Sequence, residues 1–306
     1  MADYHVPVLF NESIEALNIK PEGIYVDVTF GAGGHSRGIL DKLTTGKLIA
    51  FDQDIDAYEN LKSSKTIDIE DKRFVFFQSN FRYISNFLAY LNIDKVDGLL
   101  ADLGISSHQI DDAERGFSYR FDKQLDMRMN QQQRLSAARL IAEYSEQELT
   151  VVFRKYGELD NAYKVARKIV ETRTLNPIHT TGQLVEVVSD CFPKHKLNGF
   201  LSKIFQALRI EINQELQVLE ALLLQTEHII RKDGRLAILT YHSLEDRLVK
   251  NYIAKGNLEG ISNKDFYGNE LTSFEPFTRK PIVPEDAEIE SNSRARSAKL
   301  RIGVKR

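Results

Sequence analysis

The chain has 306 residues, of which 42% are hydrophobic and 28% charged, and its formal net charge is −3. These values are typical of a globular protein with one or two domains, and they argue against a protein that coats nucleic acid regardless of sequence. The lone Cys191 excludes an intramolecular disulfide and has no neighbouring metal-ligand cluster, so we expect no metal site. The first residues lack the basic and apolar stretches typical of a signal peptide, and no long apolar run follows, so we expect a cytoplasmic protein without a membrane segment.

The first third of the chain alternates between short apolar runs and longer mixed stretches. The runs have strand length and lie at residues 24–30, 47–52, 73–79 and 96–103. The stretches between them are long enough for crossover helices. This alternation predicts βαβ units on a parallel sheet that is buried on both faces.

The pattern changes to helical periodicity from about Leu135 to Arg231. Ser145 and Glu148 have the spacing of a capping box, which predicts a helix start. A later helix places one apolar face along Ile212, Leu216, Leu219 and Leu223, and we expect Asp233-Gly234 to end that helix.

A further apolar run at residues 235–242 predicts that the sheet resumes after the helices. The sequence therefore predicts an α/β fold, a doubly wound sheet interrupted by an all-helical insertion. We expect the sheet domain to comprise residues 1–110 and 210–306, and the insertion residues 111–209.

Three glycines follow the first predicted strand in "VDVTFGAGGHS" (26–36). A dinucleotide-binding turn needs a glycine at position 36, where this chain has Ser36. An acidic residue with glycines at alternate positions is typical of S-adenosylmethionine methyltransferases, although Thr29 replaces one glycine here. Such glycines let the backbone approach a ligand closely, whereas the alternative is a purely structural turn.

Polar residues also follow the next three predicted strands, at the edge where parallel sheets bind ligands. Asp52 stands about 20 residues after Gly31, where a carboxylate binds the ribose hydroxyls of a cofactor, whereas Asp54 is expected to cap a helix. Asn80 and Phe81 would lie beside an adenine, unless Phe81 is a core aromatic. The fourth strand is followed by Asp102, Ser106, Ser107 and Gln109.

Two segments combine features suited to RNA. Segment 114–121, "ERGFSYRF", interleaves Arg115 and Arg120 with aromatic residues that can stack on bases, although Phe117 is as readily a core residue. The tail carries cations that can neutralise phosphates, and its alternative interpretation is the closing strand of the sheet. These cations are Arg294, Arg296, Lys299, Arg301, Lys305 and Arg306.

Several long motifs together resemble the RsmH (MraW) family. They are "HVPVL" (5–9), "DVTFGAGGHS" (27–36), "FDQD" (51–54), "DGLLADLGISSHQIDDAERGFSY" (97–119), "LDMRM" (125–129), "FQALRIEINQEL" (205–216), "HSLEDRLVK" (242–250) and "RARSAKLR" (294–301). The resemblance extends along nearly the whole chain. One departure is Tyr241, where the family pattern leads us to expect Phe.

The resemblance implies an S-adenosylmethionine-dependent methyltransferase with a Rossmann-like sheet. Its implied substrate is N4 of a cytidine in the decoding region of 16S ribosomal RNA, within the small subunit, and the helical insertion lies on the substrate side. The oligomeric state stays open. The implied cofactor contacts are Gly33, Gly34, His35, Asp52, Phe81, Asp102 and Gln109.

The chemistry requires an acceptor for the amino protons of the base, and we assign Asp102 as the candidate catalytic residue. His242 is a second candidate for proton transfer, unless it belongs to a helix start in which Ser243 and Asp246 form a capping box. Alternatives are a methyltransferase of another nucleic acid or a small molecule, a dehydrogenase, and an RNA-binding module without a cofactor. Titration with S-adenosylmethionine separates the last alternative from the methyltransferases.

Overall fold

The computed structural model describes residues 7–64 and 66–306. The chain divides into two compact units. The sheet unit extends to Gly104 and resumes at Leu216, and the helical unit comprises Ile105–Glu215. The boundaries expected from the sequence, 110/111 and 209/210, lie inside the helical unit. Among the described residues, no helix is long and apolar enough to cross a membrane.

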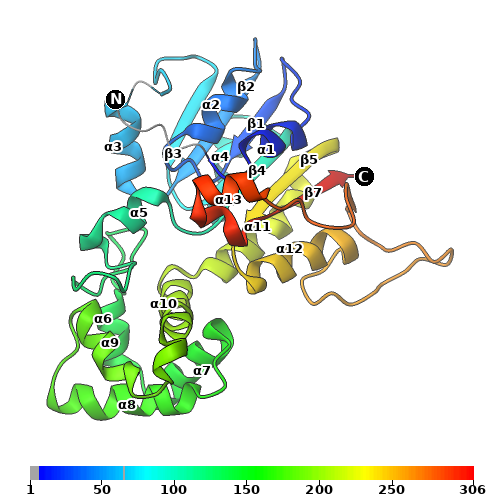
Figure 1. Cartoon of the computed structure of the whole chain (residues 1–306). Helices are drawn as coiled ribbons and strands as arrows, with labels where there is room; N and C mark the ends of the chain where they lie inside the picture. The colour runs from blue at the N-terminus through cyan, green and yellow to red at the C-terminus, as the bar shows by residue number, and fades with distance from the viewer. Residues whose placement is uncertain (1–6, 65) are drawn as a thin grey trace. The chain divides into compact units, whose positions relative to one another are not determined.

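The sheet unit contains a seven-stranded sheet in the order β3-β2-β1-β4-β5-β7-β6 (Figure 1). Neighbouring strands among β1 to β5 run parallel, and β7 is antiparallel to both β5 and β6. This arrangement confirms the predicted α/β class. The strands are β1 (Ile24–Asp27), β2 (Lys47–Asp52), β3 (Phe74–Gln78), β4 (Val96–Asp102), β5 (Ile230–Thr240), β6 (Phe274–Pro276) and β7 (Lys299–Lys305).

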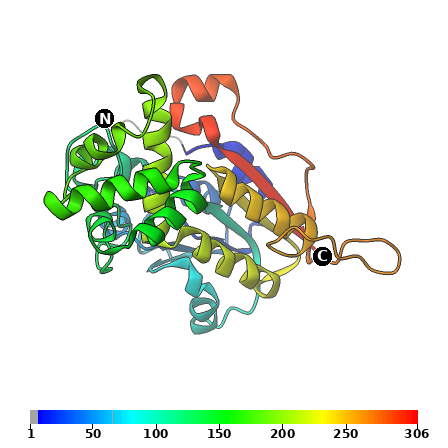
Figure 2. The ribbon, with the colours of Figure 1, turned by 90° about the horizontal axis from the view of Figure 1, so that it is seen from below.

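Helices cover both faces of this sheet. The helices of the unit are α1 (Phe10–Ala16), α2 (Gly34–Leu40), α3 (Ile55–Ser63), α4 (Ile84–Tyr90), α11 (Glu215–Ile229), α12 (Ser243–Lys255) and α13 (Asp286–Ser291), with 3-10 turns η1 (Phe81–Tyr83) and η4 (Ser293–Ser297). Side chains of α1, α2 and α3 pack on one face, and those of α4, α11 and α12 pack on the other. Figure 2 shows the ribbon of these elements from below. Because alternate residues of a strand face opposite ways, strands buried on both faces read as continuous apolar runs.

The strand order places a topological switch point between β1 and β4. After β3 at the edge, the chain returns to place β4 on the other side of β1. Ligands of open α/β sheets bind at the carboxyl ends of the strands at such a point. The residues that end β1, β2 and β4 are Asp27, Asp52 and Asp102, three carboxylic acids.

The helical unit contains only helices and loops among the elements described. These are α5 (Ser107–Asp111), η2 (Ala113–Arg115), α6 (Ala137–Glu143), α7 (Glu146–Gly157), α8 (Ala162–Leu175), α9 (Thr181–Ser189), η3 (Lys194–Lys196) and α10 (Leu197–Asn213). The predicted capping box of Ser145 and Glu148 is confirmed at the start of α7, where each side chain accepts a hydrogen bond from the backbone of the other residue.

Two helix boundaries differ from those expected. The predicted continuous helix through Ile212 and Leu216 is broken at Gln214, whose φ of 52° ends α10. Asp233-Gly234 does not follow a helix, because β5 already begins at Ile230. Asp233 has a φ of 64° inside this strand, next to a register shift against β4. Asp233 and Gly234 therefore mark an irregularity within β5 and not the end of a helix.

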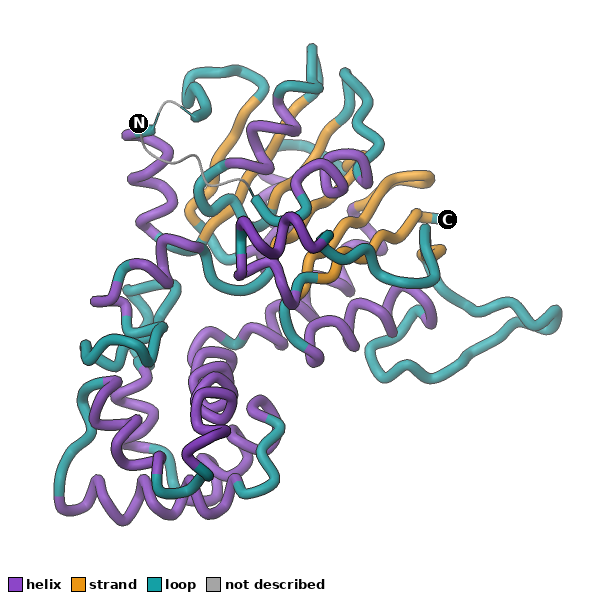
Figure 3. The backbone as a smooth tube through the Cα atoms, in the orientation of Figure 1, coloured by secondary structure: helices purple, strands orange, loops and turns teal. Residues whose placement is uncertain are grey.

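A long loop separates α12 from β6 and extends away from the sheet (Figure 3). Near its tip, Asp265 accepts hydrogen bonds from the backbone N–H groups of Tyr267 and Asn269. Phe266 and Tyr267 there are 97% and 86% exposed. The loop is therefore ordered locally by an aspartate turn while its aromatic rings face solvent.

The basic tail forms β7, so its alternative interpretation as the closing strand is the one that the structure supports. Arg301 donates to both carboxylate oxygens of Asp246, at 2.6 and 3.1 Å, and Lys299 lies 3.4 Å from the same carboxylate. Although burial raises the pKa of Asp246, the Arg301 hydrogen bonds hold it below its usual range. Two of the six tail cations therefore neutralise a carboxylate of the sheet unit.

Replacing Arg301 by Gln should lower the melting temperature. Arg301 and Asp246 are 13% and 14% exposed, and removing a charge-assisted hydrogen-bond partner costs about 2 kcal/mol. The low pKa of Asp246 stabilises the fold only at a pH above the pKa of aspartate in the unfolded chain, which is about 4. The stability lost in the variant should therefore be fully present above about pH 4 and become smaller below it. Thermal melts against pH measure this, with exposed Arg296→Gln as the matched control. Equal melts for both variants would contradict the prediction.

Candidate functional site

The glycine turn after β1 has the backbone freedom that its sequence predicts. Gly31 and Gly33 have φ values of 53° and 81°, which favour glycine. A Cβ on Gly33 would lie 2.7 Å from Phe30, and one on Gly34 would lie 2.4 Å from Pro7, whereas a Cβ on Gly31 would meet no described atom within 4 Å. Packing therefore explains Gly33 and Gly34, and Gly31 is the glycine that leaves space open.

Asp27 holds this turn together from inside. The side chain is fully buried and accepts hydrogen bonds from Ser36 Oγ at 2.7 Å and from the Thr29 N–H at 3.1 Å. Burial raises the pKa of Asp27 despite these donors. Ser36, which stands where a dinucleotide turn would have glycine, thus has a structural reason to be there.

Asp52 ends β2 and faces the same turn. Its two oxygens accept hydrogen bonds from the N–H groups of Gly31, at 2.8 Å, and Asp54, at 2.9 Å. Burial raises its pKa to about 6, more than these two donors lower it. Asp54 caps α3 through the Asp56 N–H, as expected. At neutral pH, Asp52 is therefore a partly buried carboxylate bound to the backbone of the glycine turn.

Phe81 and Asn80 follow β3, next to the end of β2. Phe81 begins η1 and is half-buried, packed against the core that includes α4 and α11. The Asn80 amide donates to Gln53 Oε1 at 2.8 Å, and its oxygen accepts from the Arg82 N–H. This link between the strand ends fixes Asn80 beside Gln53, a residue that sequence analysis did not single out.

Asp102 lies at the end of β4 and connects three parts of the sheet unit. Its backbone N–H donates to Thr29 Oγ1 at 2.6 Å, and the Tyr241 hydroxyl donates to its Oδ1 at 2.7 Å. Oδ2 lies 3.7 Å from His35 Nδ1. Burial raises the pKa of Asp102 to about 7, and the Tyr241 hydrogen bond opposes this shift. Asp102 can therefore gain or lose a proton near neutral pH.

His35 is held in the neutral form beside Asp102. The ring is 5% exposed and stacks on Phe10, with centroids 6.0 Å apart. Burial lowers its pKa to about 4, more than the nearby Val8 carbonyl raises it. At neutral pH the contact with Asp102 is therefore not an ion pair.

Gln109 belongs to the helical unit, where it forms the capping box of α5 with Ser106, the N-cap residue. Its Oε1 accepts from the Ser106 N–H at 3.0 Å, and its own N–H donates to Ser106 Oγ at 3.2 Å. The side chain is buried. Gln109 thus has a local structural role, and its predicted contact with a cofactor stays a prediction.

His242 is the N-cap of α12, so the predicted capping box is shifted by one residue. The partners are His242 and Glu245, not Ser243 and Asp246. Glu245 Oε1 lies 3.1 Å from His242 Nε2, while Oε2 accepts from the Tyr241 N–H at 2.9 Å. Asp246 instead binds Arg301. The helix-start interpretation of His242 therefore accounts for its contacts.

The basic aromatic segment 114–121 is only partly available to a ligand. Arg115 is 6% exposed and donates to the carbonyl oxygens of Arg128 and Met129, so its predicted pairing with phosphates is wrong. Phe117 is buried, and the Tyr119 hydroxyl contacts Ser202 Oγ of α10 at 3.0 Å. Arg120 and Phe121 are exposed. These two remain as the candidate RNA contacts of the segment.

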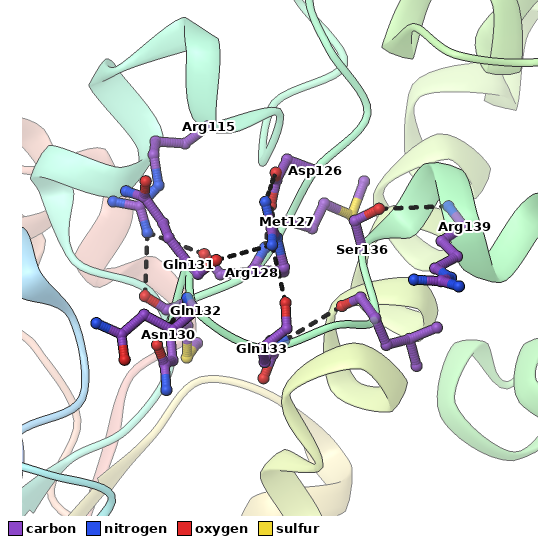
Figure 4. A network of polar contacts seen from close by, with 12 residues as sticks. Arg115, Asp126, Met127, Arg128, Asn130, Gln131, Gln132, Gln133, Ser136 and Arg139 are labelled. Carbon is purple, nitrogen blue, oxygen red and sulfur yellow. Dashed lines mark hydrogen bonds and ion pairs between the residues drawn. The ribbon is translucent and has the colours of Figure 1, made fainter.

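The "LDMRM" motif lies in a loop of the helical unit that is closed by a network of hydrogen bonds (Figure 4). Arg128 pairs with both oxygens of Asp126 and also donates to the carbonyls of Gln131 and Gln133, each at 2.8 Å. Asn213 of α10 binds the carbonyl of Met127 and the N–H of Met129. Met127 and Met129 are both buried. The motif's charged residues thus shape the loop itself.

The structure brings together most of the predicted site residues within the sheet unit. Asp52, at the end of β2, accepts a hydrogen bond from Gly31 in the glycine turn, and His35, which follows this turn, lies 3.7 Å from Asp102. Sequence analysis missed Tyr241 as a partner of Asp102 and Thr29 as the link between the turn and β4. The signal for Thr29 was present in the sequence, because a hydroxyl side chain stands there in place of the usual glycine.

Comparison with known proteins places this chain among methyltransferases. The model of a family described as the MraW methylase family matches residues 2–306. "Ribosomal RNA small subunit methyltransferase H" of Christiangramia forsetii is 53% identical over 100% of this chain and 99% of its own length. The protein of that name from Bacteroides fragilis is 50% identical, over 99% and 98%. A solved rRNA methylase structure from Streptococcus thermophilus is similar with a TM-score of 0.43 and 11% identity, covering 97% of this chain and 93% of that one.

Proposed function

Because the chain belongs to the MraW methylase family and is an S-adenosylmethionine-dependent methyltransferase, we propose that it methylates small-subunit ribosomal RNA at N4 of one cytidine in the decoding region. The observation that carries the proposal is the identity of about half of all residues, over essentially the full length, with relatives named for ribosomal RNA. Membership of a methyltransferase family argues against the alternative hypothesis of an RNA-binding module without a cofactor. A different nucleic acid or a small molecule remains the competing substrate.

The residues at the carboxyl edge of the sheet fit the cofactor chemically. S-adenosylmethionine carries a positive sulfonium, an ammonium group and two ribose hydroxyls, which all complement carboxylates. Asp52 and Asp102 supply carboxylates whose pKa values are raised by burial, to about 6 and about 7, a sign that each lacks a compensating charge. We assign the ribose to Asp52, the adenine to the side of Phe81, and the remaining contacts to the glycine turn, His35, Asp102 and Gln109.

The bound cofactor supplies a methyl group on a positively charged sulfur. The amino nitrogen of cytosine attacks poorly because its lone pair is delocalised into the ring. Asp102 can accept a hydrogen bond from this amino group at Oδ2 and take up the released proton, because its pKa of about 7 suits an acceptor near neutral pH. Orienting the two reactants contributes about 7 to 11 kcal/mol to such reactions.

We also propose that the helical unit presents the RNA. Its exposed Arg120 and Phe121 offer a cation for phosphate and an aromatic face for a base. In the tail, exposed Arg296 is a further candidate, whereas Lys299 and Arg301 are engaged by Asp246. The slightly acidic chain thus relies on a few local cations rather than on its overall charge.

The test is nucleoside mass spectrometry of ribosomal RNA from a strain that lacks this protein. We expect N4-methylation of one cytidine to disappear from small-subunit RNA only. The purified protein with labelled S-adenosylmethionine should restore it, and supplying free RNA or assembled subunits distinguishes those substrates. Transfer of the label to a large-subunit RNA, to DNA or to another position of the base would contradict the proposal.

A further inference from the structure

Tyr241 is held next to Asp102 from both of its ends. In the parallel pair of β4 and β5, Asp102 lies opposite Leu239, so Tyr241 emerges just past the same sheet edge. The Tyr241 N–H donates to Glu245 at 2.9 Å, and its ring packs against the core shared with α1 and α2. Its hydroxyl reaches Oδ1 of Asp102 at 2.7 Å. The position of this hydroxyl is therefore fixed by backbone, packing and hydrogen bond together.

We propose that Tyr241 is a positioning residue for methyl transfer, whose hydroxyl occupies Oδ1 of Asp102 and so leaves Oδ2 to face the reacting groups. This inference rests on the proposed function, in which Asp102 accepts from the amino group of the base. Oδ2 lies 3.7 Å from His35 Nδ1, which is too long for a strong hydrogen bond. The Asp102 side chain is 24% exposed, so a ligand can still reach it.

The acidic groups around Asp102 and Tyr241 favour protonation of Asp102, and the Tyr241 hydroxyl opposes them. Asp27 of β1 and Glu245 of α12 add to burial in raising the pKa of Asp102, while His35 of α2 is neutral. The Tyr241 hydrogen bond is the opposing influence. Burial, followed by Asp102 and the more distant Glu245 and Glu288, raises the pKa of Tyr241 far above its usual range. The phenol is therefore protonated at neutral pH and donates to Asp102.

Loss of the hydroxyl should make Asp102 easier to protonate. Tyr241→Phe keeps the aromatic ring, and phenylalanine is the residue that the family pattern led us to expect here. The pKa of Asp102 should then rise, so a larger fraction is protonated at neutral pH and can no longer accept at Oδ2. Because only the carboxylate is competent, activity should fall most at low pH and recover at high pH.

The experiment measures kcat/KM of the full-length enzyme from pH 5.5 to 9.5 with ribosomal substrate, for wild type and Tyr241→Phe. We expect the acid limb of the variant to move up by about one pH unit, the effect of one hydrogen bond to a charged group. The pKa of Asp102, followed by NMR with 13C-labelled aspartate, should move in the same direction without any substrate. Tyr252→Phe is the matched control, since this buried tyrosine contacts Thr226 rather than Asp102.

Two outcomes separate this inference from the function on which it rests. If Asp102→Asn retains activity with its acid limb intact, the proposed role of Asp102 fails. If Asp102→Asn abolishes transfer but Tyr241→Phe has the wild-type profile and Asp102 pKa, the positioning role of Tyr241 is overturned. An equal loss at every pH in Tyr241→Phe also overturns it, because it indicates only a packing defect.

Discussion

Replacing Asp52 by Ala is expected to weaken S-adenosylmethionine binding by about 10- to 100-fold, the value of a hydrogen bond to a charged group. Asp52 also binds the Gly31 N–H, so the variant loses both the ribose acceptor and a support of the turn. Isothermal titration calorimetry at pH 8 measures the loss. The difference from wild type should narrow below pH 6, because Asp52 itself is then protonated.

Asp54→Asn is the matched control for this prediction. Asp54 lies two residues further on, is buried, and caps α3. Asn caps helices as well as Asp does, so this variant removes a neighbouring carboxylate at little cost to stability. An Asp52→Ala protein that melts normally and binds the cofactor like Asp54→Asn would remove Asp52 from the site.

Removing the helical unit is expected to abolish methyl transfer while S-adenosylmethionine binding persists. In this variant, a flexible linker joins Gly104 to Leu216 in place of residues 105–215. The two apolar clusters that cover the faces of the sheet consist entirely of residues from the sheet unit, so this unit has its own core. Gly31, Asp52 and Asp102 also belong to it. Calorimetry and a methyl-transfer assay on the same preparation measure the two activities.

Circular dichroism and a cooperative melt must first show that the shortened protein is folded. A modest loss of affinity is compatible with the prediction, because Gln109 is removed with the helical unit. If a folded protein binds no cofactor at all, the helical unit builds part of the cofactor site rather than only presenting RNA. If methyl transfer survives, the RNA is recognised by the sheet unit.

The sequence by itself determined the parallel sheet and the positions of its acidic strand ends. Each signal is local: a doubly buried strand is a continuous apolar run, and a ligand-binding turn after it needs glycine. The runs at 47–52 and 73–79 therefore match β2 and β3 closely, and Asp52 does end β2. The capping box at Ser145 is predictable for the same reason, because both partners lie within one helical turn.

Only the tertiary structure decided which polar side chains are free to act. Arg115 and Arg120 look alike in sequence, yet Arg115 is buried against carbonyls from a loop 13 residues away, and Arg120 is exposed. Tyr241 meets Asp102 across 139 residues, because β4 and β5 are neighbours in the sheet. Burial and hydrogen bonding of these groups depend on elements distant in the chain. A local pattern contains no information about these contacts, which only the folded sheet and loops bring into reach.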